Sequence, residues 1–556
     1  MAGSLPKGGG GGPTEGELPL GRSDETKEEE EMRRRRVCVG HAVSALVLLA
    51  ALLVGGGQSV CGADSALIIA GQFEIPLLDP HATVSGTAAL VYMQVCEGLT
   101  RFEPGTSTIV PHLAERWEIS EDLTRYTFYL RQGIDFTDGA PFNAEAVKLN
   151  IERALALGQA PSTRLRDVSS VDVLDEFTVR INLSRPSTAF LSNVNVKAGF
   201  LSPKAIADHA TDSDPWATEW FNNNLVGTGP YILVEWIPGD RVILTRNPDY
   251  WGGWDGAYIE TIVRRTVPEY TTRKLLLETG EVDFIDYLQP DDAESLRSIP
   301  GVEIKYIPTI NVGWFVFQFQ DPVMWNLDLR KALSWAFPYE EANAIAGWGS
   351  QQLVGPMPDS VPGHDSTLFR YHTDLDKAAE YLAAAGYGPG ELTLNLIDYS
   401  TDRNRRWYEA FYSNLQSIGV TLEREESSWG QYSPWMASDN KDRGHMFVVV
   451  HWPNFPDPTE YLNLYFEGTL GSPPQFPRDY ENLQLNWLLG EAASERDPER
   501  RAHLYSEAQQ IIVDQALGIW AVHFYDAIAV KSYVKGIVFT PANFGVYDFY
   551  NMHIED

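Results

Sequence analysis

Segments in which every second residue is apolar recur along the chain and predict β-strands. Tyr126, Phe128 and Leu130 alternate with polar residues, and residues 176–186 repeat this pattern. Alternation of this kind places one side of a strand against a core and the other side toward water. Further short strands are expected at 66–70, 312–319, 392–397 and 448–451.

The clearest local pattern is a β-hairpin between residues 231 and 246. Ile232, Val234 and Trp236 alternate as one face of a half-buried strand would. Residues 238–240, Pro-Gly-Asp, supply the residue types that favour a tight turn, and the alternation resumes at Val242.

Apolar residues at helical spacing alternate with these strands. Val147, Ile151 and Leu155 fall on one helical face, and Asn143 is placed to cap the N-terminus of that helix. Further helices are expected at 88–99, 272–277, 329–336, 375–387, 407–418 and 495–513. A chain that mixes strands and helices throughout its length is predicted to have an α/β fold.

The N-terminal region has the residue order of a secretion signal. Residues 1–31 are low in complexity and lack the apolar surface that a core needs. The basic segment 33–36 precedes the apolar stretch 42–54, which is about 13 residues long, whereas a membrane span needs about 20. We therefore expect an extracytoplasmic protein, with cleavage after Ala63 or a lipid anchor at Cys61.

Charge and cysteine content argue against several classes of function. The 556 residues are 44% hydrophobic and carry a formal net charge of −33, which repels the phosphate backbone of nucleic acids. Only Cys96 lies beyond the expected signal, so a disulfide framework is not expected. The sequence has no Cys-x-x-Cys or His-x-x-x-His pair of the kind that binds zinc. We expect a monomer without nucleic acid, metal or cofactor.

The segment 225–256, LVGTGPYILVEWIPGDRVILTRNPDYWGGWDG, combines several motifs in order. GTGPY, a Trp-containing strand, a P-G-D turn, R-N-P and Y-W-G-G closely resemble the signature hairpin of the extracytoplasmic solute-binding proteins of peptide/nickel type, family 5. Shorter matches extend the resemblance over about 66–555: L-D-P at 78–80, E-G-L at 97–99 and G-E-V-D at 280–283. These proteins are the binding components of ATP-driven (ABC) importers.

Gly227 and Gly229 also suggest a phosphate-binding loop, because glycine-rich turns expose backbone N–H groups. No Lys-Ser or Lys-Thr follows them, however, and the segment continues into a strand instead of a helix. A structural hairpin that uses the backbone freedom of glycine is therefore the favoured interpretation.

The resemblance implies a two-lobed α/β fold, the type II periplasmic-binding-protein fold in its large, peptide-binding form. Its lobes are discontinuous in sequence. Lobe I is expected to comprise 64–110, 220–302 and 515–556, with an extra subdomain at 111–219, and lobe II to comprise 303–514. Residues 1–63, with translation starting at Met1 or Met32, are expected to form a disordered extension and a signal peptide.

In the family fold, a ligand lies between the lobes, which close over it around a hinge. The segment HWPNFPDPTEYL at 451–462 resembles the family's ligand-side loop. Trp452 would offer a flat apolar wall and an indole N–H, while Asn454 and Asp457 would supply polar groups. For Asp457, a role in structuring the turn is favoured over ligand contact.

Other candidate ligand contacts lie near strand ends and loops. Phe73 and Glu74, after the first strand, are the matching candidates from lobe I. In lobe II the candidates are Trp314, Tyr399, Trp429 and Tyr432. For each of these aromatic residues, packing is the alternative role.

The resemblance implies an oligopeptide or related small solute that is delivered to the permease subunits of an ABC transporter. In peptide-binding relatives, an acidic residue three positions before the D-P pair faces the peptide's α-amino group, and Asn454 occupies that position here. An amide suits hydroxyl-rich ligands, so an oligosaccharide is the alternative, although Asp457 or Glu74 could bind the amine. A secreted peptide or sugar hydrolase is the alternative of another class. The chain lacks G-x-S-x-G, H-E-x-x-H and other nucleophile motifs, so we expect no enzyme.

Overall fold

The computed structural model describes residues 65–195, 199–286, 288, 293–428, 431–432, 444–453, 455–467, 480–540 and 546–555. Residues 64–556 form one compact unit. The predicted extension and signal peptide at 1–63 lie outside the described residues, as do the candidate site residues Trp429 and Asn454.

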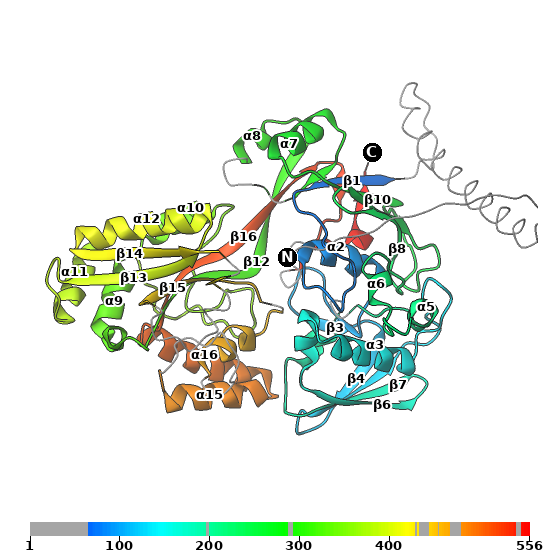
Figure 1. Cartoon of the computed structure of the whole chain (residues 1–556), viewed down its shortest axis with the longest axis horizontal. Helices are drawn as coiled ribbons and strands as arrows, with labels where there is room; N and C mark the ends of the chain where they lie inside the picture. Colours follow the sequence, from blue (N-terminus) through cyan, green and yellow to red (C-terminus); the bar gives the residue numbers. More distant parts are fainter. Residues whose placement is uncertain are drawn as a thin grey trace, which may run out of the picture. The chain divides into compact units, whose positions relative to one another are not determined.

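Ten strands form one mixed sheet (Figure 1). In order across the sheet they are β14 (Val420–Ser427), β13 (Leu392–Tyr399), β15 (Met446–His451), β12 (Val302–Phe317), β16 (Gly518–Lys531), β11 (Phe284–Ile285), β1 (Ala66–Gly71), β10 (Thr261–Thr266), β9 (Arg241–Arg246) and β8 (Tyr231–Ile237). β13 is parallel to β14 and β15, and β1 is parallel to β10 and β11. The sheet therefore contains two groups of parallel strands, separated by the antiparallel pair β12 and β16.

The long strands β12 and β16 connect two hydrophobic cores (Figure 1). They pair from Val302 opposite Lys531 to Val316 opposite Gly518, and the register shifts between Pro308 and Val312. The part of β12 that ends at Ile307 packs in the cores that contain β1, whereas the part after the shift packs in the core that contains β13. The irregularity therefore lies where the two strands pass from one core to the other.

Helices pack around the β13 group of strands and share one large core with them. They are α9 (Leu327–Ala336), α10 (Tyr339–Ala346), α11 (Leu375–Ala384), α12 (Asp402–Ser417), α15 (Leu483–Ser494) and α16 (Pro498–Asp514). Asn326, Asp374, Thr401, Asn482 and Asp497 cap five of these helices by accepting backbone N–H groups. Such caps satisfy donors that the first helical turn leaves without partners.

A separate antiparallel sheet has its own core. Its strands lie in the order β4 (Ala114–Ile119), β5 (Arg125–Leu130), β7 (Thr178–Leu183) and β6 (Val168–Asp175), and α3 (Ala144–Leu157) packs on them. Asn143 accepts the backbone N–H of Ala146, so the cap predicted for α3 is confirmed. Tyr126, Phe128 and Leu130 are buried, as the alternation predicted.

Most of the remaining elements are short. They are β2 (Thr100–Phe102), β3 (Ile109–Pro111), η1 (Ala160–Leu165), α2 (Gly86–Val95), α4 (Phe190–Asn193), α5 (Pro203–His209), α6 (Thr218–Phe221), α7 (Tyr270–Thr279), α8 (Ala293–Arg297), η4 (Pro322–Trp325), η5 (Pro458–Glu460), α14 (Asn463–Phe466), β17 (Val534–Lys535), η6 (Phe549–Asn551) and β18 (His553–Ile554). Among the described helices, none is both long and apolar enough to span a bilayer.

The predicted hairpin is present as β8 and β9, but one expectation about its buried face is wrong. Val234 is 52% exposed, whereas it was expected on the half-buried face with Ile232 and Trp236. The reason is a register shift between Leu233 and Glu235, which rotates Val234 outward because an extra residue in one strand reverses the alternation.

Candidate functional site

Three parallel strands end at one edge of the β13 group. The last residues of β13, β14 and β15 are Tyr399, Ser427 and His451. In open α/β sheets, ligands bind outside the carboxyl ends of parallel strands, where several loops meet. The loops after these strands are therefore the first place to look for ligand contacts.

Trp452 is a candidate that the structure leaves accessible at this edge. It follows the last residue of β15, and 58% of its surface is exposed. The preceding His451 is buried, and its Nδ1 lies 2.8 Å from the hydroxyl of Tyr465. Burial lowers the pKa of His451 to about 3, so its imidazole is neutral at physiological pH. The exposed Trp452 thus follows directly after a buried, uncharged and hydrogen-bonded residue.

Two of the predicted site residues lie beneath this edge. Trp314 is fully buried, and its ring packs against those of His451 and Tyr465 at centroid distances of 5.6 and 5.0 Å. Tyr432 is also buried and donates its hydroxyl to the carbonyl of Val448 at 2.6 Å. Both side chains therefore pack inside the core, which is the alternative role, and are not accessible to a ligand in this structure.

Asp457 is engaged within its own loop. Its Oδ1 accepts the backbone N–H of Thr459 at 2.9 Å and forms an ion pair with Arg501 at 2.8 Å. Burial opposes its negative charge, but Arg501 and Thr459 together hold the pKa of Asp457 below its usual value. The turn-structuring role expected from the P-D-P sequence is confirmed.

The sequence interpretation missed Arg403. This residue lies in the first turn of α12, beside Tyr399 at the end of β13. Its guanidinium carbon is 5.2 Å from the ring centroid of Trp407 and 4.9 Å from that of Phe524. Its Nε is buried without a hydrogen-bond partner, and Arg403 forms no ion pair with a described carboxylate. Burial lowers its pKa, although Tyr399 acts in the opposite direction. Only its position just after a strand end could have indicated this site.

A second edge is formed where β1, β10 and β11 end together. Phe73 and Glu74, predicted as ligand contacts, follow β1 there and are both exposed, with 48% of the Phe73 surface accessible. The Glu74 carbonyl accepts the Thr87 hydroxyl at 2.9 Å, which ties this loop to the first turn of α2.

Buried charges fix the backbone of the loop that carries Phe73. Arg264 Nη2 donates to the Phe73 carbonyl at 2.9 Å, and Asp286 Oδ1 accepts the Gln72 N–H at 3.0 Å. A Cβ at Gly71 would lie 2.2 Å from the Arg264 guanidinium, so only glycine leaves room for it. Phe73 is therefore presented on an ordered backbone.

The comparisons with known proteins identify the family. The chain matches the family model of bacterial extracellular solute-binding proteins, family 5, over residues 108–472, which is more than half of its length. The protein belongs to this family. Members of the family are substrate-binding transport proteins, not enzymes.

Relatives of this solute-binding protein align over most of its length. It is 28% identical over 485 residues to the probable D,D-dipeptide-binding periplasmic protein DdpA of Escherichia coli K12, covering 85% of this chain and 92% of that protein. HbpA2 from Haemophilus parasuis superimposes with a TM-score of 0.79 at 25% identity, covering 88% of this chain and all of that one. DppA from Helicobacter pylori, solved with the peptide STSA, gives a TM-score of 0.70 at 25% identity, with coverages of 88% and 98%. The predicted periplasmic-binding-protein fold is confirmed.

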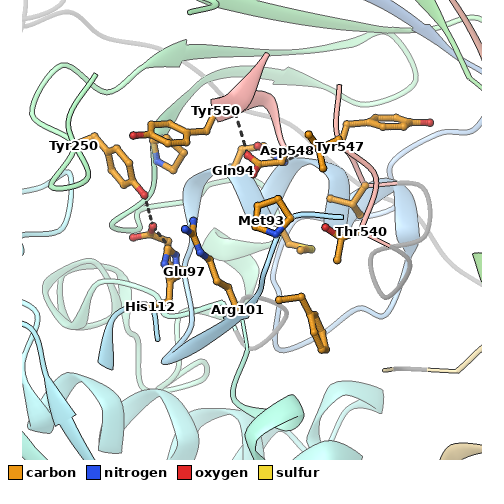
Figure 2. Close-up of a pocket in the computed structure, with 15 residues that line it drawn as sticks. Met93, Gln94, Glu97, Arg101, His112, Tyr250, Thr540, Tyr547, Asp548 and Tyr550 are labelled. Atoms are coloured by element: carbon orange, nitrogen blue, oxygen red, sulfur yellow. Dashed lines mark hydrogen bonds and ion pairs between the residues drawn. The ribbon is translucent and has the colours of Figure 1, made fainter. Parts of the chain in front are cut away.

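In this family member, three of the motifs that carry the resemblance meet at one buried carboxylate, Glu97. Figure 2 shows two of its neighbours, Tyr250 and His112. Glu97 accepts hydrogen bonds from the hydroxyls of Thr228 and Tyr250 at 2.7 and 2.8 Å and from Trp251 Nε1 at 2.8 Å. His112 Nε2 lies 2.8 Å from the same carboxylate. Burial raises the pKa of Glu97, but His112 and the donors outweigh burial and hold it below its usual value. E-G-L, GTGPY and Y-W-G-G thus form one structural network.

The glycines of GTGPY allow the hairpin to approach the end of α2. A Cβ at Gly227 would lie 2.0 Å from the carbonyl oxygen of Val95, and one at Gly229 would lie 2.6 Å from that of Gln94. Gly229 also donates its N–H to the Val95 carbonyl at 2.9 Å. These contacts explain the glycines by close packing and support the structural interpretation of the turn.

Proposed function

We propose that this protein binds a peptide or a related small solute between the Phe73 edge and the Trp452 edge and delivers it to the permease of an ABC importer. Membership of the solute-binding family supports the transport role. Two comparisons support a peptide: the E. coli relative is named for D,D-dipeptides, and the H. pylori structure contains the peptide STSA.

Arg403 is the observation that carries the ligand assignment. A guanidinium that packs against two aromatic rings, with a buried Nε and no carboxylate partner among the described residues, lacks the counter-charge that a cation removed from water needs. A carboxylate is the group that guanidinium pairs with best, through two parallel hydrogen bonds. A ligand with a free carboxylate, such as an unblocked peptide, would supply it.

The two edges belong to two lobes that the long strands connect. The proposed lobes have the boundaries expected from the sequence, and β12 and β16 act as the hinge at the register shift after Pro308. Ligand binding would draw Phe73 and Trp452 toward each other. We further propose that the mature protein is monomeric and extracytoplasmic, following removal of its N-terminal signal.

Calorimetric titration tests this function. The full mature chain is titrated with a pool of unblocked dipeptides, with the same pool amidated at the C-terminus, and with a panel of oligosaccharides. We expect binding of the unblocked pool only. Binding of oligosaccharides without peptides, or of neither, would contradict the proposed function.

A pair of arginine variants isolates the carboxylate contact. Arg403→Gln should weaken binding of the unblocked dipeptides by about 10- to 100-fold, because a hydrogen bond to a charged group contributes about 1.5–3 kcal/mol. Arg406→Gln, three residues along the same helix at an exposed position, is the matched control and should bind as the wild type does. Equal affinities of Arg403→Gln and wild type would refute the role of Arg403.

A further inference from the structure

A cavity of about 510 Å³ with both polar and apolar lining residues lies beside the Trp452 loop, outside the edges described above. One wall comes from residues 163–193, and the opposite wall comes from residues 455–494, on η5, α14 and α15. Its charged and amide lining includes Arg166, Arg185 and Asn193 on one side and Glu460, Asn463 and Glu467 on the other. We call this cavity the side chamber. Its volume falls within the range of ordinary ligand pockets, about 300–1,000 Å³.

Some polar groups that line the side chamber can form hydrogen bonds that no described residue provides. Asn193 Oδ1 is buried and has no hydrogen-bond partner in the described part of the chain, although most buried polar atoms in proteins have one. Arg185 is already paired with Asp167 at 2.8 Å, whereas no hydrogen bond or ion pair is found for Arg166 among the described residues. An unpaired acceptor and an available donor therefore remain in a cavity large enough for several ligand atoms.

Phe455 lies where the Trp452 loop meets the side chamber. It is three residues after Trp452, lines the chamber and is only 7% exposed. It forms a small separate hydrophobic cluster with Phe102 and Ala189, and Ala189 lines the chamber from the opposite wall. This apolar contact joins the two walls of the chamber at the point where the Trp452 loop reaches it.

We propose that the side chamber is a subsite for polar extensions of the ligand and that Phe455 limits access to it. The proposal rests on the proposed function. The ligand residues that the side chamber would bind carry hydroxyl, amide or paired charged groups. An apolar ligand side chain would leave Asn193 Oδ1 without a hydrogen bond. With Phe455 in place, short ligands that end at the Trp452 edge are preferred.

The test compares dipeptides with tetrapeptides that carry Asn or Ser at the third and fourth positions. In titrations of the full mature chain, the wild type should bind the dipeptides more tightly. Phe455→Ala should bind the polar tetrapeptides about tenfold more tightly than the wild type, with dipeptide affinity nearly unchanged. Phe455→Leu, which keeps an apolar contact, should retain the wild-type preference.

A second substitution shows whether any gain comes from the side chamber. Gly490 lies on α15 at the chamber wall, and a Cβ there meets nothing within 4 Å. In the Phe455→Ala background, Gly490→Phe should fill the chamber and remove the gain for tetrapeptides, while Gly490→Ala should preserve it. Because Gly490→Phe is also made alone, its effect on folding and on dipeptide binding is measured separately.

The outcomes separate this proposal from the proposed function. Dipeptide binding by the wild type with no gain for Phe455→Ala would overturn the side chamber and leave the function standing. The side-chamber proposal would also be overturned if the gain in tetrapeptide affinity persisted when Gly490→Phe is added to Phe455→Ala. If no peptide of either length binds the wild type, the proposed function fails and the side-chamber proposal fails with it.

Discussion

A buried and a half-buried carboxyl group show how a side chain's surroundings set the direction of its pKa shift. Glu97 accepts hydrogen bonds from Thr228, Tyr250 and Trp251, which stabilise its charged form. Asp526, on β16, accepts one hydrogen bond, from the N–H of the next residue. Burial therefore raises the pKa of Asp526 to about 7, and the nearby Asp286 adds to this shift. The two groups should have opposite effects on stability as pH changes.

Glu97→Gln should lower the free energy of unfolding at pH 7 by about 1–3 kcal/mol, because buried donors lose a charged acceptor. The folded-state pKa of Glu97 is lowered, so its stabilisation is present above the ordinary glutamate pKa and is lost as pH falls toward the folded value. The difference between variant and wild type should therefore shrink below about pH 4. Urea unfolding measures this difference in the free energy of unfolding, with the exposed Glu115→Gln as the control variant. A variant as stable as the wild type at pH 7 would contradict the network.

Asp526→Asn should act in the opposite direction. A raised folded-state pKa means that stability is lost as pH rises from the ordinary aspartate pKa to about 7, because the unfolded chain ionises more readily than the half-buried group. We expect the variant to gain about 1–3 kcal/mol at pH 8 and to differ little from the wild type at pH 4, since one pKa unit corresponds to about 1.4 kcal/mol. Thermal unfolding between pH 4 and pH 8 checks this prediction, with the exposed Asp212→Asn as the control variant. A variant that loses stability at pH 8 would show that Asp526 is needed as an anion.

Individual site residues were less predictable from the sequence than the elements that carry them. Trp452 was proposed because its loop resembles a family motif, and the structure leaves it exposed. Trp314 looked equivalent by its position near a strand end, yet it is buried in the core. Arg403 depends on Trp407 and on Phe524, which is more than 100 residues away, so no local pattern could show that its charge lacks a partner. Tertiary contacts, not residue type, separate the accessible candidates from the packed ones.

At the scale of the elements, local signals were reliable where local forces decide the structure. The cap at Asn143 was predictable because it depends on a hydrogen bond spanning three residues. The strand predicted at 312–319 proved to begin at Val302 and to end at Phe317. The register shift after Pro308 accommodates the missing N–H, and pairing with the distant β16 extends the strand.

The docking of the hairpin on α2 is tested by two glycine substitutions. Gly227→Ala should destabilise the protein by about 1–3 kcal/mol or more, because the new Cβ would lie 2.0 Å from the Val95 carbonyl oxygen. Gly490→Ala, in α15 and free of such a contact, should instead stabilise it by about 0.5–1 kcal/mol through helix propensity. Chemical unfolding of both variants decides the matter. Equal effects would show that close packing is not what Gly227 provides.

At the scale of the whole molecule, one continuous sheet joins two groups of parallel strands, and each group presents its carboxyl-end loops as a candidate surface. The sequence motifs indicated the family and its fold. They did not show that Glu97 gathers three motifs into one network, because their separations of up to 154 residues along the chain conceal that contact. The structure explains these three motifs by the hydrogen bonds to Glu97, and the proposals above give ligand choice to Arg403 and Phe455.

The central claim is that a peptide binds between the two edges and brings the lobes together around β12 and β16. Small-angle X-ray scattering of the mature protein, with and without a saturating unblocked dipeptide, tests it most directly. The account predicts a smaller radius of gyration in the presence of the peptide, and no change when the C-terminally amidated peptide is added at the same concentration. An unchanged radius of gyration at calorimetrically proven saturation would contradict it.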